Sequence, residues 1–381
     1  MKSKLPLVAL LGLFLSTPVL ADDLIFWDGR TIEGVRVTKE SSATVEYRRG
    51  SVSQKVDANE LRDIRYGRTS PDFTAGMAAK EKGDMLAAAN HFLDAAEDDA
   101  FEDREFIAAT ALVEAADALV DSSNFEDALS IYDQLLRQHS NTRHLARGLL
   151  GKGQCQFFTR QFPQAADTFE TLASEVESKD LGETWGLEAD FFKLWVSEAQ
   201  GARDVVGGYE ALRNEAKDVS PGVANRCSLR IGRVKLANAD VRGALPHFEE
   251  IIDSRLESSP DVVAGAFNGR GRCRFSEAQG SLRASQEAAG NRDEAGASAA
   301  REDALDAFKS ARLDFLRVQT VYKGVAREQA EALYFGGQAF LSVASLDEEA
   351  GQDELYGKIL LVRCRDGFPG TEWGKKAASE L

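Results

Sequence analysis

The chain has 381 residues, of which 43% are hydrophobic and 28% are charged. Its 62 acidic residues outnumber its 46 lysines and arginines, so the formal net charge is −16 at pH 7. Binding to nucleic acid or to an anionic membrane surface needs clustered positive charge, and this balance argues against both. The hydrophobic content is ordinary for a globular protein, so the chain has enough apolar side chains for a large core.

The first 21 residues have the pattern of a secretory signal peptide. Lys2 and Lys4 precede an apolar run over residues 5–15, and residues 19–21 end in an alanine suited to cleavage. The apolar run is too short to span a bilayer, and no cysteine near the cleavage region offers a lipid anchor. We therefore expect residues 1–21 to be removed on export. The remaining chain would be periplasmic or associated with the cell envelope, with no stable membrane insertion.

Residues 22–67 have the sequence pattern of short β-strands separated by turns. The pairs Asp28-Gly29 and Arg49-Gly50 are tight-turn signals between runs rich in β-branched residues. Five short strands in this stretch resemble an SH3-like or Sm-like barrel. The alternative is a β-meander that caps the first helix of the following domain.

From residue 70 onward, one spacing recurs four times. A small residue is followed by an alanine twelve positions later, an aromatic residue four positions further, and a small or apolar residue after three more. The four sets are Gly76/Ala88/Phe92/Ala95, Ala116/Ala128/Tyr132/Leu135, Gly153/Ala165/Phe169/Leu172 and Gly232/Ala244/Phe248/Ile251. The alanine and the ring share one face of a helix, and the small residue lets a preceding helix approach closely. Such pairs of helices must stack on one another to bury their apolar faces.

This register resembles the tetratricopeptide repeat, with its small residue in the first helix and its alanine and aromatic residue in the second. Turn signals lie between the two helices of each copy, at Gly83-Asp84, Ser122-Ser123-Asn124, Arg160-Gln161 and Ala239-Asp240. The resemblance implies an α-solenoid of six to seven helix pairs over residues 70–381. The alanine position recurs at 37 to 40 residues, with Val205 in its place once, against 34 in the family, so a HEAT-like unit of about 40 residues is the alternative.

Residues 283–303 form a polar insertion within this pattern. Alanine, serine and polar residues dominate the stretch, and Gly290 and Gly296 interrupt it. We expect two helix extensions that meet at a tip and add nothing to the core. The insertion is either a protrusion that contacts a partner or a tolerated loop.

The cysteines and histidines indicate no chemistry. The cysteines fall in separate repeats, where stacking would hold them beyond the Cα separation of about 7 Å that a disulfide tolerates, so we expect four buried thiols: Cys155, Cys227, Cys273 and Cys364. The spacing of the histidines does not place two of them on one helix face as metal ligands, and we expect all four on the surface: His91, His139, His144 and His247.

No other motif suggests an active site. The run Gly269-Arg270-Gly271-Arg272 lacks the Lys-Ser/Thr ending of a phosphate-binding loop, and no Gly-x-Ser-x-Gly elbow is present. The sequence therefore predicts a protein that is not an enzyme and that has no cofactor and no metal site.

Arginines stand out in the predicted first helices against the acidic background. In the tetratricopeptide family the first helices line the concave groove, and the resemblance places five arginines on or near it: Arg147, Arg226, Arg230, Arg233 and Arg272. Arg226 and Arg230 match the basic pair of family members that clamp a peptide's C-terminal carboxylate, although the asparagines that complete that clamp are not matched. Arginine pairs with carboxylates through two parallel hydrogen bonds, so one hypothesis is a groove for acidic or C-terminal peptide segments. The alternative is that these arginines neutralise neighbouring Asp and Glu side chains.

Taken with the signal peptide, the resemblance implies an exported scaffold or adaptor that binds proteins or peptides in envelope assembly or organisation. The alternative is a structural subunit of a large cell-envelope complex. An enzyme with a site hidden in the solenoid is disfavoured by the lack of a nucleophile, base or metal grouping.

Overall fold

The computed structural model describes residues 21–98, 104–255, 258–347 and 351–381. The predicted signal peptide therefore lies outside the described residues, apart from its last position. The chain divides into two compact units, residues 1–192 and 193–381, which are described separately below. Within the described ranges, none of the helices combines the length and the apolar character needed to cross a bilayer.

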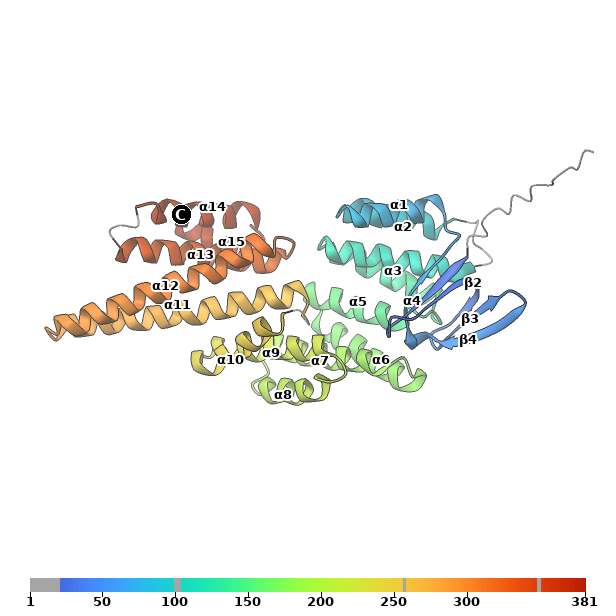
Figure 1. Cartoon of the computed structure of the whole chain (residues 1–381), viewed down its shortest axis with the longest axis horizontal. Helices are drawn as coiled ribbons and strands as arrows, with labels where there is room; N and C mark the ends of the chain where they lie inside the picture. The colour runs from blue at the N-terminus through green and yellow to red at the C-terminus, as the bar shows by residue number, and fades with distance from the viewer. Residues whose placement is uncertain (1–20, 99–103, 256–257, 348–350) are drawn as a thin grey trace, which may run out of the picture. The chain divides into compact units, whose positions relative to one another are not determined.

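The first unit opens with a small antiparallel sheet (Figure 1). Its strands are β1 (Asp22–Phe26), β2 (Thr31–Glu40), β3 (Thr44–Arg49), β4 (Val52–Asp57) and β5 (Leu61–Arg65), with a 3-10 turn at Ala58–Glu60 before β5. The strand order is β4-β3-β2-β1-β5. Alternating residues such as Leu24, Val37 and Val45 are buried on one face, as the period-two pattern requires. The five-stranded module is as predicted. Because β4 and β5 are the two edges of this order, closure into a barrel stays a prediction.

Helices make up the rest of both units. The first unit contains α1 (Pro71–Glu81), α2 (Met85–Ala96), α3 (Glu105–Asp121), α4 (Phe125–Gln138), α5 (Leu145–Phe158), α6 (Phe162–Lys179) and the start of α7 (Glu183–Ala199). The second unit contains the end of α7 and then α8 (Val205–Ala216), α9 (Pro221–Ala237), α10 (Val241–Asp253), α11 (Pro260–Gly290), α12 (Glu294–Val321), α13 (Ala326–Leu346), α14 (Asp353–Gly367) and α15 (Glu372–Glu380). Consecutive helices pair as hairpins in the predicted register, which confirms the mainly α fold of stacked hairpins.

The turn of each predicted hairpin contains a residue in the left-handed region. The backbone φ is +79° at Gly83, +62° at Ser123, +64° at Arg160 and +61° at Ala239. A left-handed residue ends a helix and redirects the chain within two or three residues, so the second helix can return along the first. All four turns lie where the sequence predicts them.

The aromatic residue of each second helix packs on small residues of first helices. The ring of Phe248 in α10 lies between Gly232 of α9 and Gly269 of α11. A Cβ added at Gly232 would lie 2.7 Å from the ring, and one at Gly269 only 2.3 Å from it. One ring therefore joins the two helices of its own hairpin and also reaches the first helix of the next hairpin.

This packing explains the Gly-x-Gly sequences in α5 and α11. In α5, a Cβ at Gly151 would lie 2.2 Å from Tyr132 of the preceding hairpin, and one at Gly153 would lie 2.4 Å from Phe169 of its own hairpin. The first glycine accommodates the previous ring and the second accommodates the ring of the same hairpin. In α11, Gly269 and Gly271 have the same two roles. Helix packing therefore explains these glycines, which do not belong to a phosphate-binding loop.

The polar stretch 283–303 is helical on both sides of a turn. It completes α11, which has 31 residues, and begins α12, which has 28. The Asp293 side chain starts α12 by accepting a hydrogen bond from the Gly296 N–H. Figure 1 shows the two long helices side by side as one hairpin, so the expectation of two helix extensions is confirmed.

All four cysteines are buried free thiols, as predicted. Burial raises the pKa of Cys155 and of Cys273 to about 12 and that of Cys364 to about 11. These thiols therefore stay protonated at neutral pH and pack as small apolar side chains.

Candidate functional site

Buried polar groups join the β-module to the helices of the first unit. The Asp22 carboxylate is 1% exposed. It accepts hydrogen bonds from the Val37 N–H (2.8 Å), the Gly67 N–H (3.0 Å) and the Arg104 guanidinium (2.8 Å). An ionised carboxylate out of water is stable only when its oxygens are paired in this way. Arg104 precedes α3, so this ion pair holds the sheet against that helix.

A second buried ion pair joins β2 to the start of α5. The Glu40 carboxylate accepts from Arg143 Nε at 3.0 Å and from the Tyr66 hydroxyl at 2.5 Å. Tyr66 in turn contacts the Thr110 hydroxyl of α3 at 3.3 Å, and Thr110 shares a hydrogen bond of 3.0 Å with His144 Nε2. The network therefore extends from the sheet through α3 to the residue before α5.

His144 corrects the expectation that all four histidines lie on the surface. Its side chain is 3% exposed, because the loop before α5 turns inward against α3. Burial, followed by the positive charges of Arg143 and Arg147, holds the pKa of His144 well below its ordinary value. His144 is therefore neutral in the folded protein at neutral pH.

This burial predicts a specific loss of stability on acidification. Between its folded-state pKa and its unfolded value of about 6.5, His144 takes up a proton only when the chain unfolds, so stability falls as the pH falls through that window. From pH 7.0 to 5.5 this contribution amounts to about 1.3 kcal/mol. Urea unfolding at the two pH values should show that His144→Gln loses about 1.3 kcal/mol less stability on acidification than the wild type does. The glutamine keeps a polar partner for Thr110. An unchanged difference between the two pH values would contradict the assignment.

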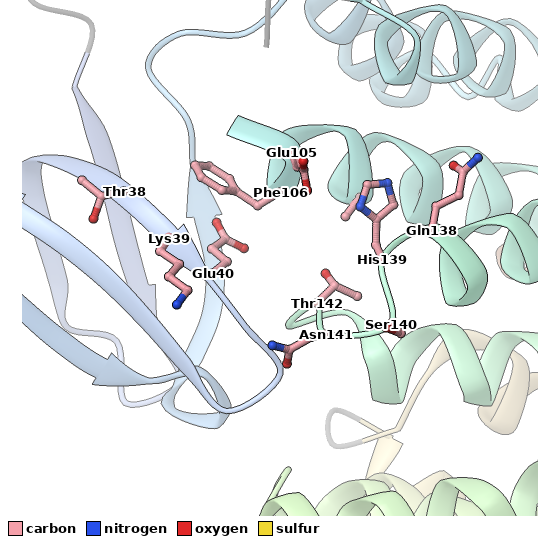
Figure 2. Close-up of a pocket in the computed structure, with 11 residues that line it drawn as sticks. Thr38, Lys39, Glu40, Glu105, Phe106, Gln138, His139, Ser140, Asn141 and Thr142 are labelled. Atoms are coloured by element: carbon pink, nitrogen blue, oxygen red, sulfur yellow. The ribbon is translucent and has the colours of Figure 1, made fainter. Parts of the chain in front are cut away.

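A cavity of about 440 Å³ lies where the β-module meets the helices (Figure 2). Figure 2 shows strand residues on one side of it and residues from α3, the end of α4 and the following loop on the other; those labelled are Thr38, Lys39, Glu40, Glu105, Phe106, Gln138, His139, Ser140, Asn141 and Thr142. Burial lowers the pKa of His139 from its ordinary value. The lining is mainly polar side chains, which suits hydrogen bonding to a partner. Sequence reasoning did not find it because its two sides are distant in the chain.

Arg147 lines an open cavity of the first unit, of about 320 Å³. Its guanidinium donates to Asp117 at 2.6 Å and to Glu114 at 2.8 Å, and Lys80 also donates to Glu114 at 2.6 Å. Tyr132, other residues of α3 to α5 and Trp185 of α7 complete the lining. The structure therefore brings Arg147 to an accessible concave surface, but neighbouring carboxylates already neutralise its charge.

Three of the arginines predicted in the second unit also have acidic partners, namely Arg230, Arg233 and Arg272. Arg230 donates through Nε to Glu198 at 3.0 Å. Arg233 donates to Glu328 at 2.6 Å, and Arg272 donates to Glu331 at 2.9 Å. The first pair connects α9 to α7, and the other two connect α9 and α11 to α13. Arg226 lies half-buried in α9, one turn before Arg230. The structure thus favours the alternative in which these arginines neutralise nearby acids, while peptide binding through them stays a prediction.

A further arginine, Arg327 of α13, lies beside this group and was missed by sequence reasoning. The guanidinium carbons of Arg230 and Arg327 lie 5.0 and 6.0 Å from the ring centroid of Trp195. Arg327 is exposed. No described carboxylate forms an ion pair with it, whereas the glutamate that follows it pairs with Arg233.

Around Arg327, desolvation and the neighbouring positive charges outweigh the attraction of the nearby Glu328 and Glu331 carboxylates. Desolvation by the surrounding protein, followed by the charge of Arg233, lowers the pKa of Arg327 from its ordinary value. Three arginines of the cluster form ion pairs with glutamates, whereas Arg327 forms none with a described carboxylate; the pairs are Arg230–Glu198, Arg233–Glu328 and Arg272–Glu331. The only sequence signal for this position was an arginine in the first turn of a predicted first helix.

Comparisons with known proteins assign no family to the chain. No family model and no curated protein matches it. Among solved structures, a tetratricopeptide repeat protein from Parabacteroides merdae ATCC 43184 aligns with a TM-score of 0.40 and 11% identity, covering 75% of this chain and 97% of its own. YrrB, described as a tetratricopeptide repeat protein with an unusual peptide-binding site, aligns with a TM-score of 0.24 and 16% identity, covering 77% of this chain and 100% of its own.

Proposed function

We propose that this protein is an exported, non-enzymatic scaffold that binds a protein or peptide partner through a carboxylate held at Arg327. The observation that carries the proposal is an exposed guanidinium, beside an indole ring, without an ionic partner among the described residues. A carboxylate from a C-terminus or an acidic side chain would supply the missing charge and two acceptor oxygens. Trp195 would provide an apolar surface for the adjoining residue of the partner.

The paired arginines have a supporting role in this proposal. Arg230 shares the Trp195 ring with Arg327, and the Arg233 and Arg272 pairs with Glu328 and Glu331 hold α13 in place. Reversing the charge of Arg272 would place two carboxylates together, and reversing that of Arg233 would place three together, in a largely buried position. Such a variant would lose structure as well as binding, so it cannot test the site.

The variant Arg327→Gln tests binding without disturbing the fold, because the side chain is exposed. We would screen the chain against a peptide library displayed with free C-termini and again with amidated C-termini. The wild type should enrich peptides with a free or side-chain carboxylate, and Arg327→Gln should lose at least tenfold in affinity for them, since a charge-assisted hydrogen-bonded pair is worth about 1.5–3 kcal/mol.

Arg242→Gln is the matched control. Arg242 is also exposed and lies in α10 of the same unit, so the variant removes the same charge away from Trp195. Equal binding by all three proteins, or enrichment of amidated peptides that contain no acidic side chain, would refute the carboxylate site.

Export follows from the predicted signal peptide and is part of the proposal. The mature protein isolated from its native cell should have a mass that corresponds to a chain beginning at Asp22. A mass that includes residues 1–21 in the cytoplasmic fraction would contradict export.

One observation favours a second function, as a structural subunit of a cell-envelope complex. Helix α14 exposes three large apolar side chains within five residues, Leu355, Tyr356 and Ile359, which are 60%, 47% and 43% exposed. A neighbouring subunit could cover such a face. Sedimentation of native extracts distinguishes the two functions, because a structural subunit migrates with a large complex and an adaptor migrates mostly free.

A further inference from the structure

Three potential metal ligands converge on the first helix hairpin. Asp72 lies in the first turn of α1, and His91 and Asp94 lie three residues apart on α2, which places them on one face. One donor atom from each residue lies within 4.8 Å of the other two. His91 Nδ1 is 3.5 Å from Asp72 Oδ1, while Asp94 is exposed and has room to adjust.

The imidazole of this group is placed as a ligand would be. His91 Nδ1 is shielded from solvent and has no hydrogen-bond partner among the described residues, although the ring itself is partly exposed. An unpaired, shielded nitrogen 3.5 Å from a carboxylate oxygen is unfavourable unless a proton or a cation lies between the two atoms. The nitrogen is directed at Asp72 rather than at a backbone carbonyl or a core hydroxyl.

The repeat register supplies an internal comparison. His247 occupies the position equivalent to His91, directly before the ring of α10, and Glu250 follows it by three residues as Asp94 follows His91. At this second position, cationic side chains of the protein itself lie beside the histidine and the glutamate. Lys235 Nζ lies 3.3 Å from His247 Nε2, and Arg213 donates to Glu250 at 2.9 Å. In the described residues around the first hairpin, no lysine or arginine takes the equivalent place.

We propose that Asp72, His91 and Asp94 form a binding site for a divalent first-row transition metal such as Zn²⁺. One imidazole nitrogen and two carboxylate oxygens are a ligand set that suits Zn²⁺, with water at the fourth position. Two ligands at normal Zn²⁺ distances are about 3.4 Å apart in a tetrahedron. The separation between His91 and Asp72 already matches this value, and rotation of the Asp94 side chain completes the set. Ca²⁺ and Mg²⁺ fit poorly because they prefer six or more oxygen ligands.

The metal would join the two helices of the terminal hairpin. Asp72 belongs to α1 and the other two ligands belong to α2, so bound metal cross-links the hairpin near the start of the first helix. Because only the folded hairpin brings the three ligands together, binding should raise the unfolding temperature of the protein.

The test uses the full chain, without a histidine tag and stripped of metal with a chelator. We expect calorimetric titration with Zn²⁺ to show one site, and titration with Co²⁺ to produce the visible absorption of a tetrahedral nitrogen–oxygen complex. His91→Gln and Asp94→Asn should each weaken binding at least tenfold and abolish the Zn²⁺-dependent rise in unfolding temperature. Both side chains are partly or fully exposed, so circular dichroism of the variants should match the wild type.

His247→Gln is the matched control and should bind Zn²⁺ as the wild type does. Absence of a titratable site in the wild type would overturn the proposal. So would loss of affinity in His247→Gln equal to that in His91→Gln, or equal binding of Ca²⁺ and Zn²⁺ by all variants. The last two outcomes would identify non-specific association with this acidic surface.

Discussion

Replacing Gly269 with alanine is expected to lower the free energy of unfolding by about 3 kcal/mol, the upper part of the range for overpacking a core. The added Cβ would lie 2.3 Å from the Phe248 ring, and the 0% exposure of that side chain leaves it no space into which to move. The helices α10 and α11 would have to separate, so the contact between two successive hairpins would be lost. Urea unfolding followed by far-UV circular dichroism measures the effect.

Gly280→Ala in the same helix is the control for this substitution. A Cβ at Gly280 would meet no atom within 4 Å, so alanine should stabilise the protein by up to about 1 kcal/mol through its higher helix propensity. The double variant Gly269→Ala/Phe248→Leu should be less destabilised than the sum of its parts, because the smaller side chain removes the clash. Similar effects of alanine at positions 269 and 280 would show that the ring does not require the glycine.

Replacing Arg104 with methionine should destabilise the β-module by about 3–5 kcal/mol, the usual cost of removing one partner from a buried ion pair. Arg104 and Asp22 are 8% and 1% exposed, and the carboxylate would keep only its two backbone N–H donors. Hydrogen exchange measured by mass spectrometry should show faster exchange in β1, β2 and β5, while the helices of the second unit exchange as before.

The exposed pair between Lys358 and Glu354 provides the control, since Lys358→Met removes a cation from a surface pair and should change stability by less than about 0.5 kcal/mol. The double variant Asp22→Asn/Arg104→Met should recover part of the stability lost in Arg104→Met, because it removes the uncompensated charge. If Arg104→Met cost no more than Lys358→Met, the buried pair would not hold the module in place.

The elements of this fold were predictable from local sequence because their signals are local. The offsets between Gly232, Ala244 and Phe248 describe two helices and the turn between them, and the contacts they predict lie within one hairpin. The strands of the β-module are separated by turn residues such as Gly29 and Gly50, which have the positive φ that those turns require. The buried cysteines followed from the same register.

Only the tertiary structure decided which charged residues remain available. Arg233 and Glu328 are 95 residues apart in the chain but 2.6 Å apart in space, so no local pattern shows that this arginine is already neutralised. The same long-range packing leaves Arg327 beside Trp195 without an ion-pair partner among the described residues, and it brings His144 into the core although we expected it on the surface.

The sequence by itself determined the hairpins, their register and the residues that pack between them, because helix periodicity and turn chemistry act over a few residues. The tertiary structure decided the pairing of charges and the convergence of Asp72 with His91 and Asp94. Electrostatic contacts depend on distances of 3–4 Å between side chains from different helices, and those distances are set only when the helices pack.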